Sequence, residues 1–145
     1  MDVFVKILNN NAKLPTYGSA EAAGADLYAA TTEDVWIPPH ETVKIGTGIA
    51  VELPKGSFGG IFARSGLAAK QGLRPANCVG VVDSDYRGEV IVALHNDTDE
   101  PQCVAPGSRI AQFIIFPTFK SDFTEVLELS DTDRGEGGFG STGTK

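Results

Sequence analysis

The alternation of apolar and polar residues predicts a chain made mostly of short β-strands. Near the N-terminus Val3, Val5 and Ile7 alternate with Phe4 and Lys6, which is the period of two that a strand requires. Turns rich in proline and glycine separate such runs, because proline fixes φ and glycine accepts a positive φ. Further strands are predicted at residues 25–29, 35–37, 42–53, 59–63, 79–82, 89–95, 110–116 and 123–129.

One short helix is predicted over residues 65–71. Ser65 is suited to the N-cap, Ala68 and Ala69 favour the helix interior, and Gly72 is a suitable stop. Many short strands with so little helix indicate an all-β sandwich or barrel.

Length and charge narrow the class of protein. The chain has 145 residues, which fits one domain, and its 41% hydrophobic and 21% charged residues are typical of a globular fold. Its net charge of −7 is opposite to that of a general nucleic-acid or anionic-membrane binder, so neither partner is expected. No apolar stretch is long enough for a secretion signal or a membrane span.

Side chains that form disulfides or bind metals are few. Cys78 and Cys103 lie in apolar stretches and are expected to be reduced core residues, with a disulfide as the alternative. The expected location is cytoplasmic, or nuclear if the source is eukaryotic or viral. His40 and His95 are far apart in the sequence and belong to no metal-binding motif, so a built-in zinc site is not expected.

Arg64-Ser65-Gly66 combines the groups that bind a phosphate. The arginine supplies charge, the serine a hydroxyl and the glycine a free backbone amide, at a predicted helix start whose dipole favours an anion. All five arginines lie in the second part of the chain, in or beside glycine-containing turns. Solvated turn residues are the alternative for any one of them. Concentrated arginines in an acidic chain favour a confined anionic ligand.

Residues 80–88 form a second candidate site. Two predicted strands joined by this turn make a β-hairpin whose backbone is suited to recognise the flat edge of a base. Asp83 directly follows an apolar strand, where partial burial suits a general base, and an Asx-turn cap is the alternative. Tyr86 belongs either to the same site or to the packing of the turn.

Five segments of the sequence resemble the motifs of one enzyme family. In order they are AGADLYAA (23–30), ARSGLAAKQGL (63–73), NCVGVVDSDYRGEV (77–90), PGSRIAQFIIFP (106–117) and RGEGGFGSTG (134–143). Over essentially the whole chain they are similar to the trimeric dUTP pyrophosphatases (dUTPases). The resemblance implies a distorted β jelly roll, a homotrimer with active sites at subunit interfaces, and hydrolysis of dUTP to dUMP and pyrophosphate. That reaction keeps uracil out of DNA and supplies dUMP for thymidylate synthesis.

The resemblance also implies roles for individual residues. Asp83 would deprotonate the water that attacks the α-phosphorus, Tyr86 would stack under the deoxyribose, and Asp26 would support the site. Mg²⁺ would be held mainly by the triphosphate and by water. The other implied substrate-binding residues are Asn77, Gly80, Val81, Val82 and Ile91 for the uracil, and Arg64, Ser65, Gly66 and Gln112 for the phosphates.

By the same resemblance, residues 1–129 form the jelly-roll domain and residues 130–145 form a C-terminal arm. Taken alone, the glycine-rich arm would be a flexible tail. The resemblance implies that the arm is exchanged between subunits and closes over the active site. Phe139 would cover the uracil and Arg134 would reach the γ-phosphate, with Gly140 and Ser141 also at the substrate.

Two other functions stay open. A dCTP deaminase shares the implied fold but normally places a glutamate beside the pyrimidine ring, whereas this turn reads Asp83-Ser84-Asp85-Tyr86. Release of ammonia from dCTP, rather than pyrophosphate from dUTP, would identify it. A nucleotide-sensing or structural trimer without turnover is the second alternative, and an assay at saturating dUTP would identify that one.

Overall fold

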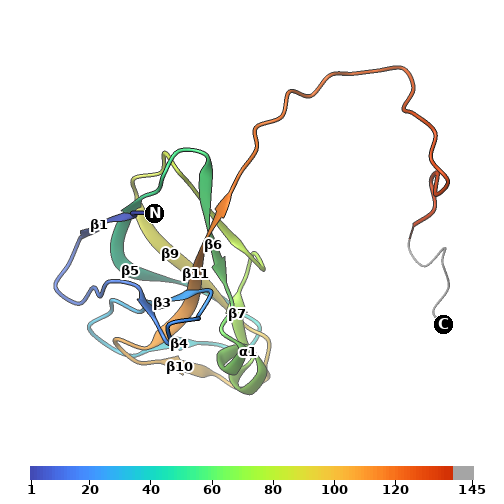
Figure 1. The fold of residues 1–145 in the computed structure, drawn as a ribbon. Helices are drawn as coiled ribbons and strands as arrows, with labels where there is room; N and C mark the ends of the chain where they lie inside the picture. The colour runs from blue at the N-terminus through green and yellow to red at the C-terminus, as the bar shows by residue number, and fades with distance from the viewer. Residues whose placement is uncertain (139–145) are drawn as a thin grey trace.

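The strands of this chain form two main sheets that face each other across an apolar core (Figure 1). The structure is a computed structural model that describes residues 1–138. One sheet has the strand order β1-β5-β9-β7 and the other β2-β3-β11-β6-β8, while β10 and β4 form a separate ribbon. All of these pairings are antiparallel.

The elements follow one another closely in the sequence. Their bounds are β1 Phe4–Ile7, β2 Thr16–Tyr17, β3 Ala25–Tyr28, β4 Val35–Ile37, β5 Thr42–Glu52, β6 Ser57–Phe62, α1 Ser65–Gln71, β7 Leu73–Pro75, β8 Gly80–Asp83, β9 Glu89–Asn96, β10 Gln102–Val104 and β11 Arg109–Pro117.

The prediction of an all-β fold with one short helix is confirmed. Most predicted strands agree with the observed ones, and β2, β7 and β10 were missed because runs of two or three residues are too short to show alternation. The strand predicted at residues 123–129 is wrong, because in this single chain those residues pair with no neighbouring strand. The predicted hairpin pairing is also wrong. β8 pairs with β6 and β9 with β5, in different sheets.

Helix α1 has the predicted bounds but a different N-cap. Arg64 is the N-cap, in an extended conformation with φ −82° and ψ 130°, and Ser65 is the first helical residue. The N-cap side chain makes no capping hydrogen bond. Gly72 ends the helix as predicted, at a φ of 63° that favours glycine, and its N–H donates to the carbonyl of Ala68 at 3.1 Å. No helix in residues 1–138 is long and apolar enough to cross a membrane.

The core is filled from both sheets by alternate strand residues. On β9, Val90, Val92 and Leu94 are buried, whereas Ile91 between them is exposed. Leu27 of β3 and Phe113 of β11 belong to the same buried cluster on the opposite side. Full burial of one such side chain contributes about 1.5–3 kcal/mol, so these contacts hold the two sheets together.

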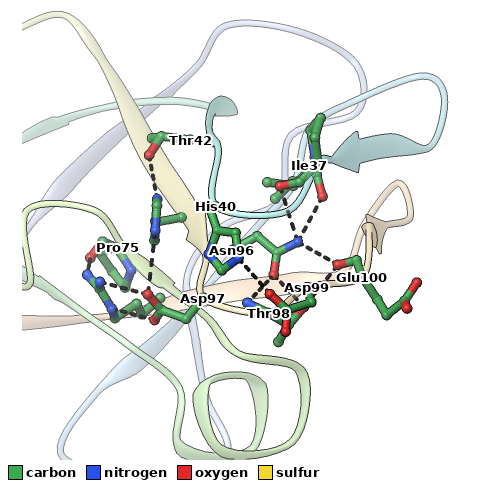
Figure 2. Close-up of polar contacts among 12 residues, drawn as sticks. Ile37, His40, Thr42, Pro75, Asn96, Asp97, Thr98, Asp99 and Glu100 are labelled. Carbon is green, nitrogen blue, oxygen red and sulfur yellow. Dashed lines mark hydrogen bonds and ion pairs between the residues drawn. The ribbon is translucent and has the colours of Figure 1, made fainter.

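Asn96, the last residue of β9, is completely buried. Its amide nitrogen donates to the carbonyl oxygens of Ile37, Pro38 and Glu100, at 3.1, 3.2 and 2.8 Å. Figure 2 shows this nitrogen directed at Ile37 and Glu100. Its carbonyl oxygen accepts hydrogen bonds from the N–H and the hydroxyl of Thr98, at 2.9 and 2.7 Å. One side chain therefore joins the end of β9 to the turn after β4 and to the loop before β10.

Asp97 connects this corner to α1 and β7. Its N–H donates to the carbonyl of Gly72 at the end of α1, at 2.9 Å. Its carboxylate accepts two hydrogen bonds from the guanidinium of Arg74, at 2.7 and 2.9 Å. These hydrogen bonds lower the pKa of Asp97 below its ordinary value and raise the pKa of Arg74 above its own.

Both cysteines are free thiols, as predicted, but Cys78 is not a core residue. It is exposed in the turn between β7 and β8, where its φ is 62°. Cys103 is half-buried on β10, and burial, together with the charge of Asp34, raises the pKa of its thiol. The raised pKa favours the protonated, less reactive form of Cys103.

After β11 the chain leaves both sheets. Figure 1 shows residues 118–138, coloured orange to red, running away from the sandwich. They form no helix or strand, and the side chains of Phe119, Phe123 and Leu127 are almost completely exposed. The domain boundary predicted at residue 129 stays a prediction.

We expect Asn96→Ala to lower the free energy of unfolding by about 3 kcal/mol, because each buried polar group left without a partner costs roughly 1–3 kcal/mol. Urea denaturation followed by circular dichroism measures the change. Asn10→Ala, at an exposed turn position, is the matched control and should change the free energy by less than about 0.5 kcal/mol. A loss for Asn96→Ala as small as that of the control would contradict the role given to its side chain.

Candidate active site

Asp26 is the centre of a cluster of charged side chains on the five-stranded sheet. Its Oδ1 accepts a hydrogen bond from Arg64 Nε at 2.8 Å, and its Oδ2 accepts one from Arg109 Nη1 at 3.2 Å. The Asp26 side chain is 13% exposed, against 27% for Arg64 and 51% for Arg109. A carboxylate this buried requires charged partners. Because a guanidinium has five N–H donors, both arginines keep donors for an anion.

Gln112 lies beside this cluster, on β11 between Asp26 of β3 and Phe62 of β6. Its side-chain amide donates to the carbonyl of Ala63 at 2.8 Å. Gly24 leaves the space that this side chain occupies, since a Cβ at Gly24 would lie 2.7 Å from Gln112 Oε1 and 3.1 Å from Gln112 Cβ. The orientation of Gln112 therefore depends on a glycine in the segment before β3.

The predicted phosphate-binding residues gather at this end of the sheet. Arg64 immediately precedes α1, and Ser65 and Gly66 form its exposed first turn. A Cβ on Gly66 would have nothing within 4 Å, so its backbone stands open to solvent. The first N–H groups of a helix have no partner within it, which leaves these amides available to an anion. The structure thus brings Arg64 and Gln112 beside Asp26, and Ser65 and Gly66 follow Arg64 at the start of α1.

The second group of predicted residues lines a pocket of about 200 Å³ between β8 and the start of β9. The hydroxyl of Tyr86 donates to the carbonyl of Glu89 at 3.1 Å, which fixes the ring at the turn between these strands. The predicted residues on its wall are Asn77, Gly80, Val81, Val82, Asp83, Tyr86 and Ile91.

Hydrogen bonds within the turn fix the backbone that carries Asp83 and Tyr86. Arg87 Nη1 donates to the carbonyls of Ser84 and Tyr86, at 2.8 and 3.1 Å. The N–H of Tyr86 donates to the carbonyl of Asp83 at 3.1 Å. The Asp83 side chain is exposed in the single chain, so the partial burial predicted for it is not present there.

The two groups lie at different ends of β6. Phe62 pairs with Gln112 of the first group, whereas Phe58 pairs with Asp83 of the second. Four residues along a strand span about 13 Å. Since Gly80 pairs with Ile61, β8 runs from the arginine-rich end toward Asp83 at the far end. Within one chain, Asp83 is therefore remote from Arg64.

The described part of the C-terminal arm carries Arg134 in a turn. Its Nε donates to the carbonyl of Gly137 at 2.8 Å, and the N–H of Gly135 donates to the carbonyl of Thr132 at 3.0 Å. Arg134 lies outside both groups described above. The predicted contacts of Phe139, Gly140 and Ser141 fall outside the described residues.

Sequence reasoning missed several residues at these sites. Arg109 received no role of its own, although an arginine directly before a strand in the fourth motif is a signal that could have been used. Ile61, Glu89 and Val90 also line the pocket, and only the sheet pairings reveal them. In residues 1–138 no group of three or more His, Cys, Asp and Glu side chains is arranged to hold a metal ion.

Fold and site together define an all-β protein of the jelly-roll class with the groups needed to bind a nucleoside phosphate. The chain belongs to the dUTPase family, whose sequence model matches residues 10–143. The predicted family and fold class are thereby confirmed.

Two relatives illustrate the similarity in sequence. A Desulfitobacterium hafniense protein named deoxyuridine 5′-triphosphate nucleotidohydrolase is 52% identical over 132 residues, which cover 90% of this chain and 87% of the relative. A Hydrogenobaculum protein of the same name is 46% identical over 145 residues, and both chains are completely covered.

Solved structures show the same fold. The dUTPase of Staphylococcus bacteriophage 80alpha, determined with dUPNHPP, superposes with a TM-score of 0.90 at 30% identity over 98% of both chains. A variant dUTPase from phage phi11 of S. aureus, described with a structural Mg(II) ion, has a TM-score of 0.82 at 24% identity. It covers 90% of this chain and is itself covered completely, and at that identity it supports the fold alone.

We expect Gly24→Ala to reduce kcat/KM for dUTP about tenfold, because the new methyl group would displace Gln112 from Ala63 and a lost hydrogen bond to a charged ligand is worth roughly 1.5–3 kcal/mol. Steady-state kinetics measure the effect. Gly18→Ala, where a Cβ would have nothing within 4 Å, is the control. Combining Gly24→Ala with Gln112→Ala should add little, and two fully additive losses would show that Gly24 acts elsewhere.

Proposed function

We propose that this protein hydrolyses dUTP to dUMP and pyrophosphate, with water attacking the α-phosphorus. The observation that carries the proposal is the pocket between β8 and β9, which gathers the seven residues in or directly after the third motif that are predicted for base and sugar binding and for catalysis. β8 is the outer strand of its sheet, so its free edge offers backbone N–H and C=O groups to a flat pyrimidine. The membership of the chain in the dUTPase family supports the same reaction.

Asp83 is the proposed general base. Its exposed carboxylate at the end of β8 accepts a proton from the attacking water, which is general-base catalysis. The ring of Tyr86, anchored by its hydroxyl on Glu89, lies under the deoxyribose and meets a ribose 2′-OH with an apolar face. Asn77 and the edge of β8 bind the uracil.

The triphosphate is proposed to bind Arg64, Ser65, Gly66 and Gln112. Asp26 keeps Arg64 oriented through its 2.8 Å contact, so it positions a phosphate ligand rather than taking part in the chemistry. Arg109 shares Asp26 and gives the same end of the sheet a second guanidinium. Fixed arginines of this kind stabilise the charge that develops on the phosphates during displacement.

We further propose a homotrimer with active sites between subunits. Asp83 and Arg64 lie beside opposite ends of β6, and a second chain that supplies the arginines would bring both groups to one nucleotide. The exposed apolar side chains of Phe119, Phe123 and Leu127 also require a partner surface. An arm exchanged between chains supplies that surface and brings Arg134 and Phe139 to a neighbouring site.

Mg²⁺ fits this proposal as an ion carried by the substrate. Both oxygens of Asp26 already accept hydrogen bonds from arginines, and in residues 1–138 no group of three or more acidic, His or Cys side chains is arranged to hold a metal ion. Mg²⁺ characteristically keeps several waters and binds substrate phosphates with few protein ligands. When bound, it neutralises charge on the triphosphate, while the residues above position the phosphates around it.

A deaminase would need a glutamate free to act on the pyrimidine. Glu89 does line the pocket, but its Oε1 already accepts a hydrogen bond from the N–H of Gly48 at 2.8 Å. The hydrogen bond at Glu89 therefore favours pyrophosphate release from dUTP over deamination of dCTP. Parallel assays of dUTP, dCTP, dTTP and UTP for pyrophosphate and ammonia test the proposal, and ammonia from dCTP without pyrophosphate from dUTP would overturn it.

We expect Asp83→Asn to fold and to bind a non-hydrolysable dUTP analogue, while its kcat falls by about 10²–10⁴-fold because the general base is lost. A coupled pyrophosphate assay and titration calorimetry measure the two quantities. Asp85→Asn is the matched control, since it removes an exposed acid from the same turn. Turnover of Asp83→Asn equal to that of the control would remove Asp83 from the mechanism.

We expect sedimentation of the full chain to give a mass near three times 15.3 kDa with or without nucleotide. Deletion of every residue after Asp133 should leave a trimer of similar Tm, because no strand includes those residues among the described ones. Its kcat/KM should fall by at least about 100-fold, since small losses of substrate positioning have effects of that size. A fully active monomer, or a truncated protein with wild-type kinetics, would overturn the shared-site arrangement.

A further inference from the structure

Strand β5 contains a bulge directly opposite the start of β9. Gly46 pairs with Ile91 and Ala50 pairs with Glu89, so three residues of β5 face the single residue Val90 of β9. A bulge of this kind interrupts the ladder and leaves backbone groups without strand partners. At this point those groups lie beside the pocket that Glu89, Val90 and Ile91 line.

Two side chains supply the missing partners. Thr47 donates its hydroxyl hydrogen to the carbonyl of Val90 at 2.6 Å, and Thr47 is buried. Glu89 Oε1 accepts the N–H of Gly48 at 2.8 Å. Each strand therefore sends one side chain across to a backbone group of the other.

The glycines of β5 leave room for these contacts. A Cβ at Gly46 would lie 2.5 Å from Glu89 Oε1, so any larger residue displaces the carboxylate. Gly48 has a φ of 67°, which favours glycine, and a Cβ there would meet Ala12, Asn9 and Ala30 within 3 Å. The segment Gly46-Thr47-Gly48 is thus shaped to receive Glu89.

The start of β9 needs this support because it has no ladder to β8. The two walls of the pocket belong to different sheets, so the separation between them is set by whatever fixes β9 on β5. Tyr86 is fixed through the same point, since its hydroxyl donates to the carbonyl of Glu89 at 3.1 Å. A shift of Glu89 therefore moves both a pocket wall and the ring of Tyr86.

We propose that Thr47 and Glu89 are positioning residues for the reaction, which hold β9 and Tyr86 at the spacing that selects deoxyuridine nucleotides. The inference rests on the proposed function, because it assigns these residues a share in the selectivity of that same pocket. Neither side chain is assigned a contact with the reacting atoms, so both act through the backbone of residues 86–91.

The first test compares Glu89→Ala with Glu89→Gln in the full-length protein. Glu89→Ala should lower kcat/KM for dUTP about tenfold and narrow the preference for dUTP over UTP by a similar factor, because the Tyr86 ring loses its fixed position. Glu89→Gln keeps an oxygen that accepts the Gly48 N–H, so it should restore both quantities. Glu33→Ala, at an exposed turn position, is the control.

A second pair of variants changes the residues of β5 that take part in or adjoin the same contacts. Thr47→Val keeps the shape of the side chain and removes the hydroxyl, and Gly46→Ala displaces the Glu89 carboxylate without altering Glu89. Both variants should lower the preference for dUTP over UTP, as Glu89→Ala should. They keep the inference testable if Glu89→Ala does not fold.

Hydrogen–deuterium exchange provides a readout that does not depend on turnover. Amides of residues 86–91 should exchange faster in Glu89→Ala and Thr47→Val than in wild type and Glu33→Ala. Unchanged exchange, or a lower Tm with unchanged selectivity in all variants, would overturn the inference. A Glu89→Gln variant as impaired as Glu89→Ala would also overturn it, since the charge itself would then be required. Failure of the proposed function appears separately, as a wild-type protein that does not hydrolyse dUTP.

Discussion

The pocket exists because β8 and β9 share a turn but not a sheet. If the two strands paired with each other, their backbone groups would be used in a ladder and no space would remain between them. Instead β8 bonds to β6 and β9 bonds to β5, and Val82 and Val90 each anchor one wall in the common core. Packing between the sheets, together with the contacts that fix β9 on β5, therefore sets the width of the pocket. Alternation then leaves Val81, Asp83 and Ile91 exposed between the buried positions.

The same strand geometry underlies the proposal of a site shared between subunits. The arginine-rich group lies beside one end of β6 and Asp83 beside the other, and a rigid strand cannot bring its own ends together. In the proposed trimer, each group would keep its place on a well-supported piece of sheet. Asp26 illustrates the effect of this support. Its carboxylate is only 13% exposed and orients two arginines, whose side chains would be mobile on a solvated loop.

Period-two alternation sufficed to predict most strands and the all-β class, because each strand shows in its own sequence which face is buried. The short helix was predicted from the residues at its ends and in its interior. Alternation within a strand does not show which other strand it pairs with, and for that reason the hairpin of β8 and β9 was predicted wrongly. The phosphate-binding and pocket residues lie in local motifs, and their roles stay predictions that the family resemblance implies. Arg109, Thr47 and Glu89 escaped notice, since their partners Asp26, Val90 and Gly48 lie far away in the sequence.

An acidic chain that binds a polyanion needs local rather than long-range attraction. With a net charge of −7, the field of the whole protein repels a nucleotide, but charges are screened beyond about 8 Å at physiological ionic strength. Within that distance the fixed guanidinium groups of Arg64 and Arg109 dominate, partly offset by the single charge of Asp26. A long nucleic acid would lie over much of this acidic chain, whereas the nucleotide of the proposed reaction would lie within screening distance of the arginines. The charge distribution would therefore favour a free nucleotide over a polymer.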